Sequence, residues 1–377
     1  MKLQVDNSVF SDAVSWVART IPHRPAHPTL AGLKIVADGE GKVALSSRDS
    51  DIDSRVYIDA EVIDEGEVLV NGKLLADICR SLPQQPIEFS MDGNKVDIEC
   101  GSTHFSMKVM SMEDYVDMHE RPPLVGTVDG AVWQEAVQQV TIAASHDDTL
   151  PMLVSVCIEI EGDTITLMAT DRYRLAVKEI SWKPEDPTIS QRILVRASRL
   201  LDIAKALGSA GPVSLCLNDT QAPTLIGFSA VGKHNTVQLI DGEYPQVISL
   251  FPENVEGYAV MDRAELSEAI KRARLVVEKN SAVRLAFSQD QLILEAGHGD
   301  AAQASEALAA NVSGSDIAMA FNPVFLQDGL SVMDSQLVRL AYTQESKPAV
   351  LTEEKDENAE QSSFRLLLMP IRTYGSR

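Results

Sequence analysis

Three segments far apart in the chain repeat one helical pattern of apolar residues. In SVFSDAVSWVART (8–20), AVWQEAVQQVTIA (131–143) and RAELSEAIKRARLV (263–276), apolar side chains recur at i, i+3, i+4 and i+7. This spacing places them on one face of an α-helix. The pattern predicts three amphipathic helices, whose apolar faces comprise Phe10, Ala13, Val14 and Val17, then Trp133, Ala136, Val137 and Val140, then Leu266, Ala269, Ile270 and Ala273.

A second pattern recurs between these helices. VLVNGKLLADICRSL (68–82), ILVRASRLLDIAKAL (193–207) and AMAFNPVFLQDGLSVM (318–333) each read as a short apolar strand, a polar break and a helix. Two sets of residues are in register at offsets of 125 and 126 positions: Leu75, Leu200 and Leu326, and Asp77, Asp202 and Asp328. Two independent landmarks with nearly the same period predict three similar units with two helices each.

The segments between the helices alternate apolar and polar residues around turn signals. LKIVADGEGKVALSS (33–47), VSVCIEIEGDTITLMATD (154–171) and VRLAFSQDQLILEAG (283–297) therefore predict antiparallel hairpins with one buried face. Helices on one face of such sheets make each unit α+β. Proline-containing linkers at 119–125 and 251–257 predict domains at 1–124, 125–253 and 254–377, and the polar segment 352–363 predicts a mobile loop between the last two strands.

Composition changes this picture in one respect. The 377 residues include 33 Lys and Arg and 55 Asp and Glu, which gives a net charge of −22. The average field repels phosphate, which argues against a protein that coats nucleic acid or lies on an anionic membrane, although a local basic track remains possible. Four scattered cysteines without a CxxC pair, no apolar run of about 18 residues and no signal-peptide pattern favour a reduced, cytoplasmic location.

Partial matches to metal-binding and catalytic motifs in this sequence each lack residues that the motif requires. Asp49, Asp51 and Asp53 mimic the start of an EF-hand loop, but Ser54 and Ala60 occupy its glycine and bidentate-glutamate positions. His146-Asp147-Asp148 has no accompanying nucleophile motif, and a polar loop is the better interpretation. The sequence therefore favours a binding or scaffold protein with no cofactor and no metal. An enzyme with an unrecognised site and a peptide-binding scaffold that never meets DNA remain alternatives.

Specific motifs then point to a family. The threefold α+β repeat, the opening FSDAVSWVA (10–18), ATDRYRLAV (169–177), FNPVFLQDGL (321–330) and LLLMPIR (366–372) resemble the bacterial DNA sliding clamp, the beta subunit of DNA polymerase III, and its actinobacterial members in particular. The resemblance covers the whole chain. It implies a non-catalytic, head-to-tail homodimer whose helices line a closed ring around double-stranded DNA, with antiparallel sheets outside. It also implies partners: the DNA polymerase III catalytic subunit, the clamp loader, and other polymerases and repair proteins.

Encirclement reconciles an acidic chain with DNA, because a closed ring needs no tight phosphate contacts and slides better without them. We expect a weak basic lining. Arg24 stands in the loop IPHRPAHP at a family DNA-contact position, and the predicted helices add Lys73, Arg80, Arg196, Arg199, Lys205, Lys271 and Arg272. Segments 133–145 and 322–333 carry no basic residue. For any single helix residue, an ordinary solvated face remains the alternative.

The resemblance also implies a groove for partner peptides between the second and third domains. Its matching residues are Leu153, Thr170, Arg172, Tyr173, Arg174, Leu175, Pro245, Leu250, Leu367, Leu368, Met369, Pro370, Ile371 and Arg372. Tyr173 stands where some members have histidine, and Ser249 replaces a basic residue of others, so a drug-resistance paralogue with an altered groove stays open. Leu175 fits a core strand equally well, and the role of the final TYGSR is undefined.

A dimer seam is expected between the first domain of one chain and the third domain of the other. The candidates are Phe105 and Met107, on a strand that would pair edge to edge with its partner, and Leu275, which would pack across. Edge pairing would also hide strand edges that otherwise aggregate. Phe105 as an ordinary core residue is the alternative.

Overall fold

The computed structural model describes residues 1–278, 281–297, 302–354 and 362–371. They form two compact units. Unit 1 comprises residues 1–131, 183–186 and 202–239, and unit 2 comprises 132–182, 187–201 and 240–377, the latter described outside the gaps above. The boundary between the two units passes through the expected middle domain. It falls within helices α3 (Gly130–Thr141) and α4 (Ala197–Leu207).

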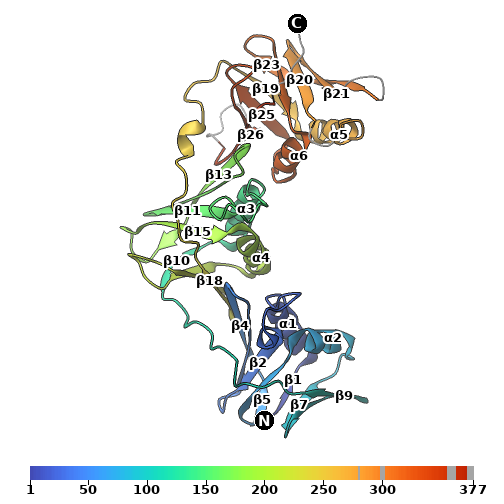
Figure 1. Ribbon diagram of the computed structural model, residues 1–377, viewed down its shortest axis with the longest axis vertical. Coiled ribbons are helices and arrows are strands. Elements are labelled where there is room, and N and C mark those ends of the chain that lie inside the picture. Colours follow the sequence, from blue (N-terminus) through green and yellow to red (C-terminus); the bar gives the residue numbers. More distant parts are fainter. Residues whose placement is uncertain (279–280, 298–301, 355–361, 372–377) are drawn as a thin grey trace. The chain divides into compact units, whose positions relative to one another are not determined.

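In unit 1, helices α1 (Asn7–Ala18) and α2 (Gly72–Ser81) lie side by side (Figure 1). The Asp6 carboxylate caps α1 by accepting the backbone N–H groups of Ser8 and Val9, and Asn71 caps α2 in the same way. The predicted apolar stripes are buried, as the full burial of Phe10 and Leu75 shows. Hydrophobic periodicity was therefore a sufficient guide to both helices.

Two antiparallel sheets complete unit 1, together with the 3₁₀ turns η1 (Pro28–Ala31) and η2 (Gly208–Ala210). The five-stranded sheet has the order β5 (Glu61–Asp64), β1 (Lys2–Val5), β7 (Ile87–Asp92), β8 (Lys95–Cys100) and β9 (Thr103–Lys108). The nine-stranded sheet has the order β14 (Lys183–Pro184), β10 (Leu124–Val128), β16 (Val213–Leu217), β17 (Leu225–Ala230), β18 (Lys233–Gln238), β4 (Ile52–Asp59), β3 (Lys42–Arg48), β2 (Gly32–Ala37) and β6 (Gly66–Asn71).

Unit 2 has the same kind of architecture, with helices α5 (Arg263–Ala273) and α6 (Pro323–Ser331) packed together and the 3₁₀ turn η3 (Ile248–Leu250). Its nine-stranded sheet has the order β15 (Ser190–Arg196), β11 (Ser155–Glu161), β12 (Thr164–Thr170), β13 (Arg174–Ser181), β27 (Phe364–Leu368), β26 (Ala349–Glu354), β25 (Leu337–Tyr342), β19 (Gly257–Asp262) and β23 (Asn311–Ser313). Its four-stranded sheet has the order β22 (Ala304–Ala309), β21 (Gln291–Ala296), β20 (Val283–Ser288) and β24 (Ile317–Phe321).

Each nine-stranded sheet joins strands from two of the expected sequence domains. In unit 1, β18 pairs with β4 from Lys233 opposite Val56 to Val237 opposite Ile52. In unit 2, β13 pairs with β27 from Arg174 opposite Leu368 to Lys178 opposite Phe364. The repeats are thus joined by main-chain hydrogen bonds between strands, a form of connection that the sequence pattern does not reveal.

The six predicted helices and three predicted hairpins are confirmed, whereas the predicted loop begins too early. Thr352 to Glu354 belong to β26, and the buried Glu353 carboxylate accepts the backbone N–H groups of Asp334 and Ser335 at 2.8 and 3.3 Å. These bonds hold a polar stretch in the sheet. Of the rest of the expected loop, 355–361 lies outside the described residues, and Ser362 and Ser363 precede β27 without belonging to a strand.

Of the three aspartates that mimic an EF-hand, Asp53 has a structural role. Asp53 is buried, lies 3.6 Å from Arg48 Nε, and accepts the His119 backbone N–H at 2.8 Å. Among the described residues, no group of three or more His, Cys, Asp or Glu is placed to hold a metal, and no helix is long and apolar enough to cross a bilayer. All four cysteines are buried and free.

The β18–β4 junction predicts a pH effect on stability. The His234 ring lies 2.7 Å from Ser229 Oγ and meets Tyr57 edge-on. Burial, reinforced by the charges of Arg121 and Arg55, lowers the pKa of His234 to about 4. The unfolded chain binds this proton near pH 6.5, so the free energy of unfolding decreases as pH falls from there toward 4.

We therefore expect His234→Gln to lose less stability than the unchanged chain between pH 7 and 5, as measured by urea unfolding. His23→Gln, at an exposed loop position, is the matched control and should follow the unchanged chain. Parallel pH curves for all three proteins would contradict the assignment.

Candidate functional site

The predicted groove residues surround an apolar cluster in unit 2. Its buried members come from β11, β12, β13, β15, β27 and the segment before η3: Cys157, Met168, Leu175, Val177, Leu194, Tyr244, Val247 and Leu367. Met152, Ile240 and Phe251 pack against it and are partly exposed. Leu175 and Leu367 are almost fully buried, and Leu368 likewise. Leu175 and Leu367, which pair across β13 and β27, therefore form the floor of the site, whereas the strand alternation directs Leu368 to the opposite face of the sheet.

Apolar side chains above this floor remain open to solvent. Tyr173 is 57% exposed, Leu250 53%, Met369 41% and Ile371 37%. The Met369 N–H donates to the Tyr173 carbonyl at 2.9 Å, and the Leu250 N–H donates to the carbonyl of Val247, a member of the cluster. Leu153 and Pro370 are half-buried, and Pro245 is exposed. A flexible methionine beside aliphatic and aromatic groups suits an apolar peptide side chain.

A tight turn presents Tyr173 at this surface. Asp171 Oδ1 accepts the backbone N–H groups of Tyr173 and Arg174, both at 3.0 Å. The buried Thr170 hydroxyl accepts the Arg172 N–H at 3.2 Å and donates to the Arg174 carbonyl at 2.7 Å. Arg172 has a φ of +79°, in the left-handed region that disfavours residues with a side chain. The surrounding hydrogen bonds hold this conformation.

Arg174 lies beneath the surface. Its side chain is 5% exposed, its Nε lies 3.0 Å from Asp171 and its Nη1 lies 2.7 Å from Asp328 on α6. The guanidinium also lies over the Phe325 ring, 4.3 Å from its centre. Both carboxylates neutralise its charge, so the residue joins the 171–174 turn to α6.

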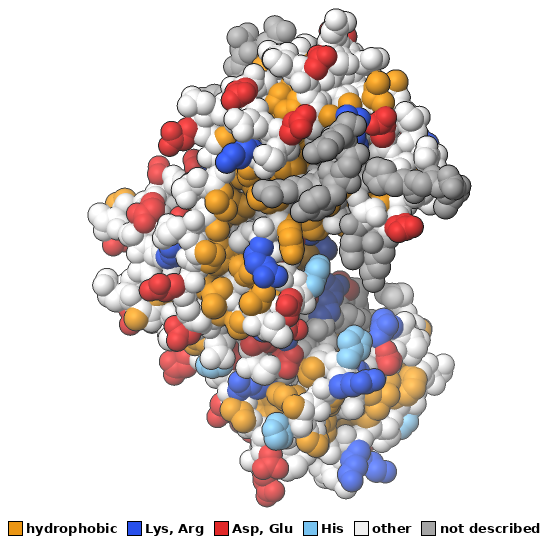
Figure 2. Space-filling view, turned by 45° about the horizontal axis from the view of Figure 1, so that its top comes forward, with side chains coloured by type: hydrophobic (Ala, Val, Ile, Leu, Met, Phe, Trp, Pro, Cys, Tyr) orange, Lys and Arg blue, Asp and Glu red, His pale blue; other side chains and the backbone are white. Residues whose placement is uncertain are grey.

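Four of the eight predicted DNA-binding side chains are engaged in local ion pairs. Arg80 pairs with Asp77, Arg196 with Asp148 at 2.9 Å, Lys271 with Glu268 at 2.6 Å and Arg272 Nε with Glu306 at 3.0 Å. Lys73 Nζ donates to the Pro22 carbonyl at 2.7 Å and so steadies the loop that carries the exposed Arg24. Lys205 is exposed and Arg199 is half-buried. Acidic and basic side chains are also interspersed on the face shown in Figure 2.

Two of the three predicted seam residues, Phe105 and Met107, lie on the edge strand β9. Three longer edge strands receive hydrogen bonds from other segments: β6 from the Met110 N–H, β15 from the Ile240 N–H and β24 from the Ile371 N–H. Within the described residues, no backbone hydrogen bond covers the outer side of β9 or β22. β9 carries the half-buried Phe105 and the buried Met107, and Leu275, two residues after α5, is 84% exposed. Uncovered strand edges offer sites for pairing with another chain.

Comparisons with known proteins decide the family. Models of the DNA polymerase III beta subunit match in order: the N-terminal domain at residues 1–119, the central domain at 127–246 and the C-terminal domain at 248–371. The beta sliding clamp of Streptomyces coelicolor is 48% identical over 377 residues, which is 100% of both chains. The corresponding protein of Micrococcus luteus is 49% identical over 82% of this chain and 98% of its own.

The chain belongs to the DNA polymerase III beta subunit family, the beta sliding clamps.

Solved clamp structures share the fold at lower identity. The beta subunit from Streptococcus pyogenes covers 99% of this chain and 100% of its own with a TM-score of 0.91 at 21% identity. A Pseudomonas aeruginosa clamp bound to griselimycin has a TM-score of 0.90 at 22% identity, over 99% of this chain and 100% of its own. The actinobacterial relationship inferred from sequence is thereby confirmed, and so is the α+β clamp fold.

The clamp sequence alone did not identify every residue that shapes the groove. Met152, Tyr244 and Phe251 pack at the floor, and Phe325 and Asp328 hold Arg174. Asp328 did carry a signal, since it is in register with Asp77 and Asp202 in the repeat. Arg372 and the final TYGSR lie outside the described residues.

The tie between Arg174 and α6 yields a prediction about stability. Asp328→Asn removes one of two carboxylates from a buried guanidinium and should lower the free energy of unfolding by about 1–2 kcal/mol. Asp77→Asn is a matched control from the same repeat position, whose pair with Arg80 is exposed, and should cost less than about 0.5 kcal/mol. Urea unfolding measures both values, and equal losses would contradict a structural role for Arg174.

Proposed function

We propose that two copies of this chain close head to tail into a ring around duplex DNA, and that the ring tethers DNA polymerase III without catalysing a reaction itself. The observation that carries this proposal is membership of the beta clamp family over the whole length. In this proposal the chain acts in the cytoplasm, where bacterial DNA is replicated, and its three clamp domains are residues 1–124, 125–253 and 254–377.

The ion pairs of the basic side chains support sliding. A protein that neutralises many phosphates binds DNA tightly and with a steep salt dependence. Here Arg80, Arg196, Lys271 and Arg272 already have carboxylate partners within the chain. Arg24, Lys73, Arg199 and Lys205 would complete a lining that guides the duplex without holding one position. Residence on DNA would then come from the closed ring.

The edge strands support the seam. β9 and β22 are six residues long and lack a covering segment within the described residues, so each can extend a sheet of the partner subunit. Leu275, at 84% exposure, would lose its contact with water in such an interface, and Phe105 and Met107 would lie on the paired strand. Two copies joined head to tail form a closed ring when the rotations that relate successive copies add up to a full turn.

The exposed apolar surface around Tyr173, Leu250 and Met369 supports peptide capture. Its floor is a packed cluster, its wall residues are flexible or aromatic, and the turn at 171–174 is fixed by hydrogen bonds. A preorganised site loses little entropy when a peptide binds. Its occupants would be short segments of the DNA polymerase III catalytic subunit, the clamp loader, other polymerases and repair proteins.

The chain is more similar to a relative named a beta sliding clamp than to one named a clamp homologue, which favours the replication clamp over a paralogue. A beta sliding clamp homologue from Streptomyces muensis, GriR, is 37% identical over 373 residues, less than the 48% shared with the Streptomyces coelicolor clamp. Tyr173 and Ser249 remain the positions at which an altered groove would show itself.

A retention assay tests encirclement. With clamp loader and ATP, the chain loaded on nicked circular DNA should remain bound after gel filtration at high salt, because a ring cannot leave a circle. Cutting the circle once should release it, and blocking both ends with bound protein should restore retention. Equal retention on open linear and circular DNA would contradict a ring.

A second variant tests the groove. The double variant Met369→Ala with Pro370→Ala should bind a labelled peptide from the DNA polymerase III catalytic subunit with about 10-fold lower affinity, because apolar contact area is lost. The dimer should be unchanged. Leu337→Ala, an apolar position on β25 with similar exposure, is the matched control and should bind normally. Unchanged affinity of the double variant in fluorescence polarisation would remove both residues from the groove.

A further inference from the structure

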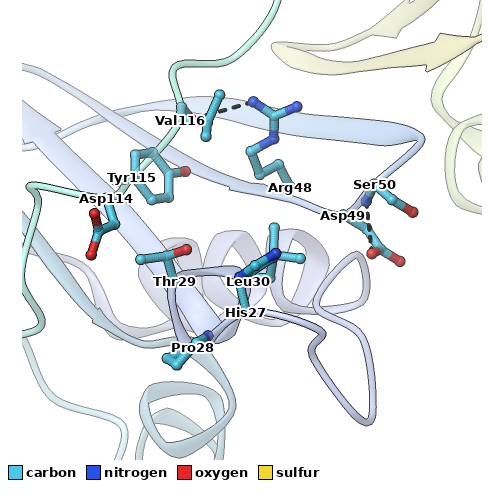
Figure 3. Close-up of a pocket in the computed structure, with 10 residues that line it drawn as sticks. All are labelled: His27, Pro28, Thr29, Leu30, Arg48, Asp49, Ser50, Asp114, Tyr115 and Val116. Carbon is cyan, nitrogen blue, oxygen red and sulfur yellow. Dashed lines mark hydrogen bonds between the residues drawn. The ribbon is translucent and has the colours of Figure 1, made fainter.

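Unit 1 contains a cavity of about 570 Å³ that the proposed clamp function does not use. Three segments form it (Figure 3): His27–Leu30 at the start of η1, Arg48–Ser50 at the end of β3, and Asp114–Val116 in the chain that follows β9. Pockets that bind small molecules or single side chains have volumes of about 300–1,000 Å³. The cavity is therefore large enough for a ligand.

Hydrogen bonds fix the segment that closes one side of the cavity. Arg48 Nη1 donates to the carbonyls of Val116 and Asp117 at 3.3 and 2.6 Å. The Arg48 side chain also lies 3.6 Å from the buried Asp53 carboxylate, which in turn accepts the His119 N–H. The positive charge in the wall is thus already balanced, and the cavity is formed before any ligand arrives.

The interior of the cavity is apolar. Pro28, Leu30, Val116 and the Tyr115 ring supply the apolar surface. The Tyr115 hydroxyl is shielded from solvent, so the ring and not the hydroxyl is the part of this residue that a ligand can contact (Figure 3).

The rim is acidic. Asp49 and Asp114 stand on opposite sides of the opening in Figure 3, and Glu113 and Asp117 flank Asp114 in the sequence. The whole chain adds a net charge of −22. This field attracts cations and repels acidic peptides.

We propose that this cavity binds a short basic segment of a partner protein. One apolar side chain of that segment packs between Leu30 and the Tyr115 ring, and a Lys or Arg beside the apolar residue pairs with Asp49 or Asp114. The site is separate from the groove of unit 2, so a partner can hold one site while the other is occupied by a different protein.

Fluorescence polarisation with the full chain and the labelled peptide Gly-Lys-Leu-Lys-Gly tests the proposal. Replacing both lysines of the peptide by Glu should abolish binding, and replacing its leucine by Ala should weaken binding about 5-fold. Saturable binding should weaken at high salt. No binding up to millimolar protein, or equal binding of the glutamate peptide, would overturn the proposal.

Protein variants locate the site. Val116→Trp fills the opening at a 65% exposed position and should weaken binding at least 10-fold, whereas Val231→Trp, at a 76% exposed position elsewhere in unit 1, should not. Asp49→Asn with Asp114→Asn should weaken binding about 5-fold. Asp64→Asn with Glu65→Gln removes the same charge from another exposed edge and should have less than a 2-fold effect. Equal losses in the test and control variants would show general attraction to an acidic protein and would overturn the proposal.

Discussion

Every strand at the edge of a sheet must be paired, covered or left as a site for another chain, and this constraint organises the molecule. Pairing of β18 with β4 and of β13 with β27 joins strands of different sequence repeats into continuous sheets. Single backbone hydrogen bonds from Met110, Ile240 and Ile371 cover β6, β15 and β24. β9 and β22 lack such cover within the described residues, and the proposed ring is the arrangement that uses both.

In the proposed ring, the surface charges of this chain allow sliding along DNA more than they hold DNA tightly. Half of the side chains expected to face DNA are paired with carboxylates of the same chain, and acidic and basic side chains are interspersed on the face shown in Figure 2. Buried charge has the opposite role: Arg174 between Asp171 and Asp328, and Arg48 beside Asp53, fix turns and connecting segments. The groove and the unit 1 cavity both depend on such an anchored arginine.

Local pattern predicted the helices and hairpins because burial follows periodicity, as the buried Phe10, Trp133 and Leu266 illustrate. The family motif predicted which residues line a groove, but it could not separate buried residues from exposed ones, since the burial of Leu175 and Leu367 and the exposure of Met369 follow only from the folded sheet. Arg174 was expected at the peptide surface; its burial depends on Asp328, 154 residues away. Glu353 was assigned to a loop because its acceptor role depends on distant N–H groups.

Light scattering of the purified chain after size exclusion tests ring closure through the uncovered edges most directly. The chain has a mass of 41.1 kDa, so a closed pair predicts 2 × 41.1, or about 82 kDa, independent of concentration over the micromolar range. A stable mass near 41.1 kDa, or a mass that keeps rising with concentration as in an open filament, would contradict the account.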